Sequence, residues 1–242
     1  MKKTGNRRSF SPMREFRPDR DMLLTVVIFT EGLLLLIGTL WCYVGNIMLA
    51  PVLVPHWQDF AIGAAMGVAL VITSIAIYGI SHLLEKVLSK SQAGSILSMK
   101  EIAIHELAPF FKNSTLPDIV IISLVSGFCE EVFFRGAIQL EFNLWIAAFI
   151  FGMFHMPTFR YLAYGIWAMT AGVLFGVAMQ ATHSLWTPIT AHVLNNLLVI
   201  LFLRYGPVEK LGSQIDSSSP SNKNPGPGAD KNQDLSDGKA DQ

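Results

Sequence analysis

The feature that most constrains the fold of this chain is a series of long apolar segments with almost no charge. The first, residues 22–44, contains Glu31 as its one charged side chain, and the second, residues 60–80, contains none. A helix needs about 20 apolar residues to cross the hydrocarbon core of a bilayer. Backbone polar groups within lipid must be hydrogen-bonded internally, so such segments fold as helices. The sequence therefore predicts an all-α, polytopic membrane protein.

The composition agrees with the bilayer as the solvent of this chain. Of its 242 residues, 51% are hydrophobic and 15% are charged, whereas about a quarter of the residues in a soluble domain are charged. The formal net charge is zero, so the basic field that nucleic-acid binding uses is missing. These values argue against a soluble enzyme and against a nucleic-acid partner.

Later apolar segments extend the count to about six transmembrane helices. They lie at about residues 119–140, 144–156, 161–181 and 185–203. The chain is expected to divide into a basic N-terminal segment, two transmembrane helices with an amphipathic cytoplasmic segment, a core, and a polar tail whose composition predicts disorder. The corresponding ranges are 1–21, 22–116, 117–205 and 206–242.

The basic side chains predict the orientation of this bundle. Seven Lys and Arg residues lie in segment 1–21 and four in segment 81–118, whereas links 45–59 and 182–184 contain none. Lys and Arg accumulate in cytoplasmic segments of membrane proteins. Both termini are therefore expected to be cytoplasmic.

Ionisable residues inside an apolar segment indicate a functional site, because each costs about 2.5–3.5 kcal/mol at the centre of a transmembrane helix. Glu131 and Arg135 are four residues apart with the acid first, which favours an ion pair on one helical face. Glu130 lies about 100° around the helix from Glu131, without an obvious partner. It is a candidate base, with a packing carboxyl group bonded to a neighbouring helix as the alternative. For Glu31 we expect an interhelical hydrogen bond rather than a place in the site.

Two later segments add polar side chains at helical spacing. Phe151 and His155 share one face at i and i+4, as do His192 and Asn196, and Asn195 is expected to point elsewhere. Taken singly, each histidine is more often a satisfied buried side chain, and the asparagine more often a hydrogen-bond link between helices.

The combination of these residues favours catalysis over packing. Glu130, His155, His192 and Asn196 come from three expected helices and supply a base, an imidazole and hydrogen-bond donors. Peptide hydrolysis needs a base that deprotonates water and donors aimed at the developing oxyanion. The Gly-x-Ser-x-Gly and His-Glu-x-x-His motifs of other hydrolases are absent from the sequence.

These residues give the sequence a resemblance to the CPBP intramembrane proteases. This family comprises the CAAX proteases and bacteriocin-processing (Abi) proteins and includes the type II CAAX prenyl endopeptidases. Its Glu-Glu-x-x-x-Arg motif resembles residues 130–135, its Phe-x-x-x-His motif residues 151–155, and its His-x-x-x-Asn motif residues 192–196. The prenyl endopeptidases have about eight spans, so a chain of about six resembles more closely the bacterial branch that matures peptides or confers immunity.

The resemblance implies a role for each matching position. Glu130 would be the general base on water, with His155 positioning or polarising that water, and His192 and Asn196 would stabilise the oxyanion. The residues that would shape the site are Glu131, Arg135 and Phe151. We expect no required metal. The alternative is a zinc site with Glu130, His155 and His192 as ligands, since three protein ligands and one open position are usual for catalytic zinc.

The expected function is therefore that of an intramembrane endopeptidase in a bacterial plasma membrane. Its partners would be the lipid bilayer and a peptide or membrane-associated protein substrate, processed at a CAAX-type or a leader/bacteriocin-type site. One alternative is a non-catalytic immunity or scaffold protein with the same fold. Another is a small transporter with a proton relay, which an inverted repeat would favour, and no such repeat is visible in the sequence.

Overall fold

The computed structural model of the protein describes residues 19–87 and 102–206. Most of the expected basic N-terminal segment, the middle of the amphipathic segment and nearly all of the polar tail lie outside these described residues. The predictions for those parts stay predictions. Within the described residues every element of secondary structure is a helix, which confirms the all-α fold class.

Four of the described helices are long and apolar enough to cross a membrane. Each corresponds to one of the expected spans and begins or ends within a few residues of the predicted boundary, apart from the second, which continues beyond residue 80. These helices are α1 (Arg20–Val44), α2 (Trp57–Val87), α8 (Leu162–Thr182) and α9 (Trp186–Tyr205).

The third and fourth expected spans have a different form. The third is a continuous helical path made of α5 (Leu116–Glu131), the π-helix η3 (Val132–Ile138) and α6 (Gln139–Glu141). The fourth is α7 (Leu144–Phe154), which has 11 residues and reaches roughly 16 Å at 1.5 Å per residue. A helix of that length ends partway through a bilayer instead of crossing it.

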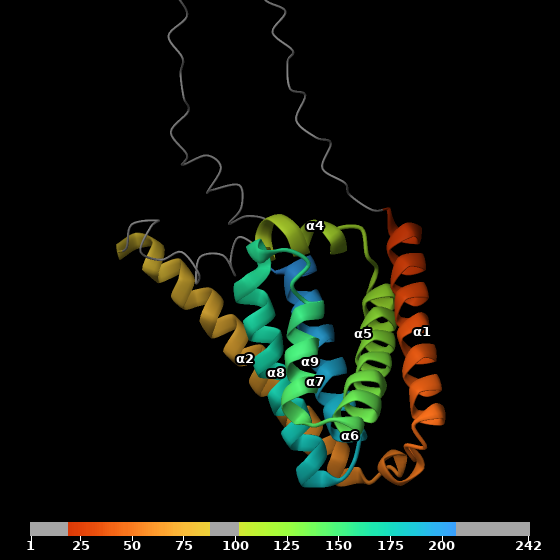
Figure 1. Ribbon diagram of the computed structural model, residues 1–242. Helices are drawn as coiled ribbons and strands as arrows, with labels where there is room; N and C mark the ends of the chain where they lie inside the picture. The colour runs from red at the N-terminus through yellow and green to blue at the C-terminus, as the bar shows by residue number, and fades with distance from the viewer. Residues whose placement is uncertain (1–18, 88–101, 207–242) are drawn as a thin grey trace, which may run out of the picture.

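Short elements connect these helices. They are η1 (Ala50–Leu53), η2 (Ile102–Leu107), α4 (Ala108–Phe111) and η4 (Phe159–Tyr161). Figure 1 shows that α1 begins, and α9 ends, at the end of the bundle where α4 lies. This arrangement agrees with termini on one side of a membrane, and the cytoplasmic identity of that side stays a prediction.

Polar side chains at the helix starts determine where α1 and α5 begin and how they meet. Asp19 caps α1 by accepting a hydrogen bond from the backbone N–H of Met22. Thr115 and Asp118 form a reciprocal capping box at the start of α5, which satisfies backbone donors that a helix otherwise leaves free. Asp118 also accepts two hydrogen bonds from the guanidinium of Arg20, at 2.7 and 2.8 Å. This bidentate pair, of which Asp118 is buried and Arg20 half-exposed, joins the start of α1 to the start of α5.

Helix α9 packs against α2, α5 and α8, and glycines allow the close approach. A Cβ atom at Gly63 of α2 would lie 2.5 Å from the carbonyl oxygen of Thr187 on α9, and one at Gly127 of α5 would lie 2.6 Å from Cγ2 of Val193. Small residues are what permit such packing between membrane helices. The close contacts keep α9, which carries His192 and Asn196, against its neighbours.

Candidate functional site

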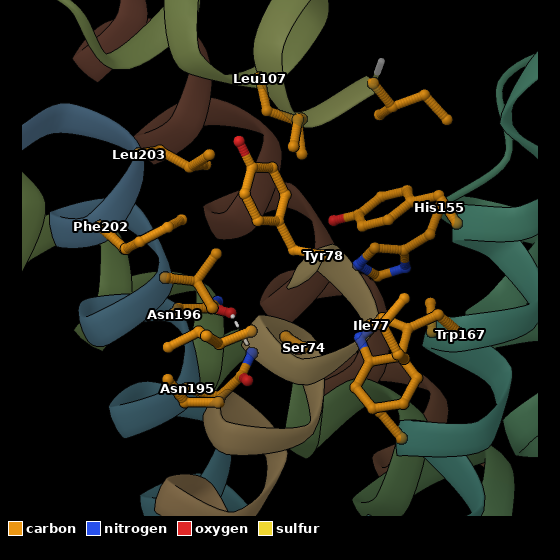
Figure 2. A pocket seen from close by; sticks show the side chains of 18 of the residues that line it. Ser74, Ile77, Tyr78, Leu107, His155, Trp167, Asn195, Asn196, Phe202 and Leu203 are labelled. Atoms are coloured by element: carbon orange, nitrogen blue, oxygen red, sulfur yellow. Dashed lines mark hydrogen bonds between the residues drawn. The ribbon is translucent and has the colours of Figure 1, made fainter. Parts of the chain in front are cut away.

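A cavity lies among α2, α7, α8 and α9, next to η2. Most of its wall is apolar, and Figure 2 shows His155 on one side and the side chains of Asn195 and Asn196 on another. The lining residues that matter for the chemistry are His155, Tyr164, His192, Asn195 and Asn196. Apolar walls with a few convergent polar groups are typical of binding sites.

His155 meets Glu130 beside this cavity. Nε2 of His155 is 3.9 Å from Oε2 of Glu130, and Nδ1 of His155 is 2.8 Å from the carbonyl oxygen of Phe151. A hydrogen bond donated by Nδ1–H fixes the ring and turns Nε2 toward the carboxylate. The shortness of α7 explains why His155 lies next to Glu130. Helix α7 starts at the end of the bundle opposite α4 and ends at Phe154. His155 therefore lies at the same depth in the bundle as Glu130, the second last residue of α5.

Glu31, on α1, is a neighbour of Glu130, on α5. The carboxyl group of Glu31 lies close enough to that of Glu130 for the two to interact electrostatically, and one oxygen of each carboxyl is buried without a hydrogen-bond partner among the side chains that the structure describes. The interhelical hydrogen bond expected for Glu31 stays a prediction.

Glu131 is the centre of a second, fully buried cluster. Nη1 of Arg135 donates to its Oε1 at 3.1 Å, and Nδ1 of His192 is 2.7 Å from the same oxygen. Arg135 also donates through Nη2 to the carbonyl oxygen of Gly172 at 3.0 Å. The side chains of Glu131 and Arg135 are 0% exposed, whereas those of Glu130 and His155 are 14% and 22% exposed. The Glu130–His155 pair is therefore more exposed than the Glu131–Arg135 pair.

Aromatic rings enclose this cluster. The guanidinium carbon of Arg135 lies 4.5 Å from the ring centre of Phe151 and 5.3 Å from that of Phe175, a distance at which cation–π attraction operates. The His192 ring stacks on Phe175, with centres 5.1 Å apart and planes 17° apart. Phe151 also contacts the His155 ring, at 4.5 Å. The phenylalanine of the Phe-x-x-x-His motif thus packs against both parts of the site.

Asn196 is held by two hydrogen bonds. Its Nδ2 donates to the hydroxyl of Ser126 on α5 at 3.0 Å, and its Oδ1 accepts from Nδ2 of Asn195 at 3.4 Å, which is long for a hydrogen bond. The expectation that Asn195 points elsewhere is wrong, because Asn195 lines the cavity together with His192 and Asn196. Residues at i and i+3 share a helical face just as those at i and i+4 do.

Sequence reasoning did not identify three other polar residues near the site. Ser126 bonds Asn196, and Tyr164 lines the cavity with its ring centre 5.8 Å from that of His155. Gln139 donates through its amide to the carbonyl oxygen of Gly176 at 3.1 Å. A polar residue inside an apolar segment was the available signal for Gln139, whereas Ser126 and Tyr164 are ordinary residues of membrane helices.

The zinc ligand set considered from the sequence does not come together in this arrangement. Among the side chains that the structure describes, no three His, Cys, Asp or Glu residues are placed to hold one metal ion. The donor set of Glu130, His155 and His192 is therefore not assembled around one point in this conformation.

Comparison with known proteins concerns the part of the chain that holds this site. Residues 112–198 match the family described as type II CAAX prenyl endopeptidase Rce1-like. A relative from Bacillus subtilis (strain 168), called uncharacterized protein YpbD, is 31% identical over 103 residues, which are 41% of this chain and 53% of that protein. The match thus spans about half the length of that relative. No solved structure matches the chain. Residues 112–198 of this chain are thus similar to the CAAX protease family, and the chain is an integral membrane protein built of helices.

Proposed function

We propose that the protein is an intramembrane endopeptidase in which Glu130 activates a water molecule without a metal ion. The observation that carries the proposal is the approach of Glu130 and His155, 3.9 Å apart, beside a cavity that His192 and Asn196 also line. The similarity of residues 112–198 to the Rce1-like family supports the same reaction class.

The geometry of Glu130 and His155 suits a water that donates to both. The distance of 3.9 Å between Nε2 and Oε2 is too long for a direct hydrogen bond, and a separation of this size is often bridged by water. Because Nδ1–H of His155 is directed at a carbonyl oxygen, neutral His155 presents an acceptor at Nε2. A water that donates one hydrogen to Glu130 and the other to His155 turns its lone pairs toward the substrate.

Hydrolysis then proceeds by general base catalysis. The water oxygen bonds to the carbonyl carbon of the scissile peptide, its proton passes to Glu130, and the carbonyl oxygen becomes an oxyanion. Glu130 returns the proton to the amide nitrogen as the C–N bond breaks. The products are a carboxylic acid and an amine, and transfer of the remaining water proton from the acid to the amine gives a carboxylate and an ammonium group. A positioned base contributes about 10²- to 10⁴-fold to the rate of such a step.

His192 and Asn196 are assigned to the oxyanion. Asn196 Nδ2 carries two hydrogens, of which one is bound to Ser126. His192, held at Nδ1 by Glu131, presents an N–H at Nε2 when it is an imidazolium. Loss of one oxyanion donor typically lowers kcat by about 10²- to 10³-fold.

The proposed substrate is a peptide or the end of a membrane-associated protein, at a CAAX-type or a leader/bacteriocin-type site. The apolar wall of the cavity, with Trp167, Phe175 and Phe202, suits a chain that reaches the site from lipid. The proposed location is a bacterial plasma membrane, in keeping with the bacterial relative.

The test uses purified protein in liposomes with two probes: a farnesylated CAAX-type C-terminal peptide and the same peptide without the prenyl group. Cleavage of at least one probe is expected, and Glu130→Gln and His155→Ala should each lower the rate at least 100-fold. Glu141→Gln is the matched control, because it makes the same substitution at an exposed carboxyl group. Elution as a single detergent-solubilised species shows that each variant is folded.

Two outcomes would contradict the proposal. Equal cleavage by the wild type and the Glu130→Gln variant would remove Glu130 as the base. Tight probe binding with no cleavage by the folded wild-type protein would favour the non-catalytic immunity or scaffold protein.

A further inference from the structure

Asn195 has a buried acceptor that the site as described does not use. Its Nδ2 donates to Asn196, whereas its Oδ1 is buried and has no hydrogen-bond partner among residues 19–87 and 102–206. A buried carbonyl oxygen without a donor costs free energy, and such groups are rare unless a ligand or water supplies the donor. The unused oxygen therefore indicates a partner that enters the cavity.

The position of Asn195 shows what kind of donor can reach it. Asn195, Asn196 and His192 line the cavity from one side of α9. The apolar residues Val199 and Phe202 line it further along the same helix. Figure 2 shows Asn195 and Asn196 next to each other, joined by their hydrogen bond. A substrate oxygen that accepts hydrogen bonds from His192 and Asn196 must therefore lie beside the side-chain amide of Asn195.

A peptide in this cavity brings donors with it. Every non-proline residue carries one backbone N–H, and an N–H that leaves water for an apolar environment must find an acceptor. Most of the cavity wall is apolar and offers few acceptors. Adjacent peptide groups are about 3.8 Å apart along the chain, so an N–H close to the scissile carbonyl falls near Asn195 when that carbonyl faces Asn196.

We propose that Asn195 is a substrate-binding residue whose Oδ1 accepts a hydrogen bond from a backbone N–H of the bound peptide next to the scissile bond. The inference rests on the proposed function, because it takes a peptide as the occupant of the cavity. It adds to the site a residue that none of the motif positions includes, and it gives Asn195 a contact with the substrate in addition to its contact with Asn196.

The experiment measures binding instead of turnover. Each of the two probe peptides is prepared as a series in which one amide near the scissile bond at a time is replaced by an ester, which removes the N–H and keeps the carbonyl. Dissociation constants are measured on Glu130→Gln protein in liposomes. One ester position is expected to weaken binding 5- to 20-fold relative to the all-amide peptide.

Variants at residue 195 identify the partner of that N–H. In the Glu130→Gln/Asn195→Leu protein, the ester and all-amide peptides should bind within twofold of each other. In Glu130→Gln/Asn195→Asp protein the ester effect should persist, because Asp keeps an acceptor oxygen while losing the donor to Asn196. A residue that only orients Asn196 through that donor would give the same result for Asp and Leu.

A control and a second variant complete the series. Ser74→Ala changes another polar residue of the cavity wall, whose hydroxyl donates to the carbonyl oxygen of Leu70 at 3.0 Å, and the ester effect should persist in it. Asn195→Ala replaces Asn195→Leu if the leucine variant aggregates in detergent.

The outcomes separate this inference from the proposed function. The inference is overturned if no ester position weakens binding, or if the ester effect is the same with Asn and Leu at residue 195. If the ester effect depends on residue 195 while wild-type protein cleaves neither probe, the binding role of Asn195 stands and the peptidase does not.

Discussion

At the residue scale, a carboxylate shared by Arg135 and His192 holds the buried centre of the site. The ion pair of Glu131 with Arg135 follows from their spacing, but His192 joins the same oxygen from α9. Removing one member of a buried pair leaves an uncompensated charge and costs about 3–5 kcal/mol, whereas replacing both with apolar residues is often neutral. The free energy of unfolding therefore depends on Glu131 and Arg135 together and not on either residue alone.

Glu131→Leu should lower the unfolding midpoint in detergent strongly, because Arg135 would remain charged, fully buried and without a carboxylate. Arg135→Leu should cost less, because Glu131 keeps His192 as a partner. The double variant should be more stable than Glu131→Leu alone. Thermal unfolding followed by circular dichroism measures all three. Glu141→Leu, at an exposed carboxyl group, should change the midpoint little, and a double variant that loses the sum of the two single effects would contradict the prediction.

At the element scale, the length of α7 and the glycines of α5 and α2 position the site. The 11-residue α7 ends where His155 reaches Glu130, and the path of α5, η3 and α6 changes to π winding immediately after Glu131. Close packing at Gly127 keeps α9 against α5, which is also where Asn196 bonds Ser126.

Gly127→Ala should separate α5 from α9. A Cβ atom there would lie 2.6 Å from Cγ2 and 2.9 Å from the backbone nitrogen of Val193, so the helix itself must move. Overpacking of this kind costs about 1–3 kcal/mol, and a shift of about 1 Å in a catalytic group can lower the rate 10²-fold. We expect a lower unfolding midpoint and at least tenfold slower probe cleavage.

The matched control is Gly32→Ala, the same substitution on α1, where a Cβ atom would meet nothing within 4 Å. It should leave both the midpoint and the cleavage rate unchanged. Equal effects of the two substitutions would show that the approach of α5 and α9 is not what positions the site.

At the scale of the whole molecule, the bundle places a partly polar cavity among helices that cross a membrane. Its reactive side chains come from α5, α7 and α9, so the site exists only when the helices are assembled. That assembly brings no three metal-ligating side chains to one point among the described residues, which distinguishes it from a zinc site with three protein ligands.

Chelation tests this difference. Probe cleavage in liposomes should be unchanged after treatment with EDTA or 1,10-phenanthroline, because the proposed base acts on water directly. A zinc protease treated in the same liposomes should lose its activity and serves as the control. Loss of cleavage that added zinc restores would assign the water activation to a metal instead.

The sequence by itself determined the features that follow from local spacing and from the solvent. Apolar segments long enough to span lipid predicted helices because lipid offers backbone groups no partners, and the bounds of α1, α8 and α9 lie close to the predicted ones. The spacing of Glu131 and Arg135 predicted their ion pair, which the structure contains at 3.1 Å. The family resemblance over three motifs is matched by the family found at residues 112–198.

Only the tertiary structure decided which residues from different helices meet. The proximity of Glu31 to Glu130 and the hydrogen bond between His192 and Glu131 depend on how the helices are rotated and how deeply each one extends, and neither quantity is encoded in the spacing along one helix. The same holds for Asn195. Its spacing of three residues from His192 does not decide which way its side chain faces, and only the location of the cavity shows that it lies on the same side of α9 as His192. Catalytic roles depend further on protonation states and on the substrate. The cleavage and binding experiments address both.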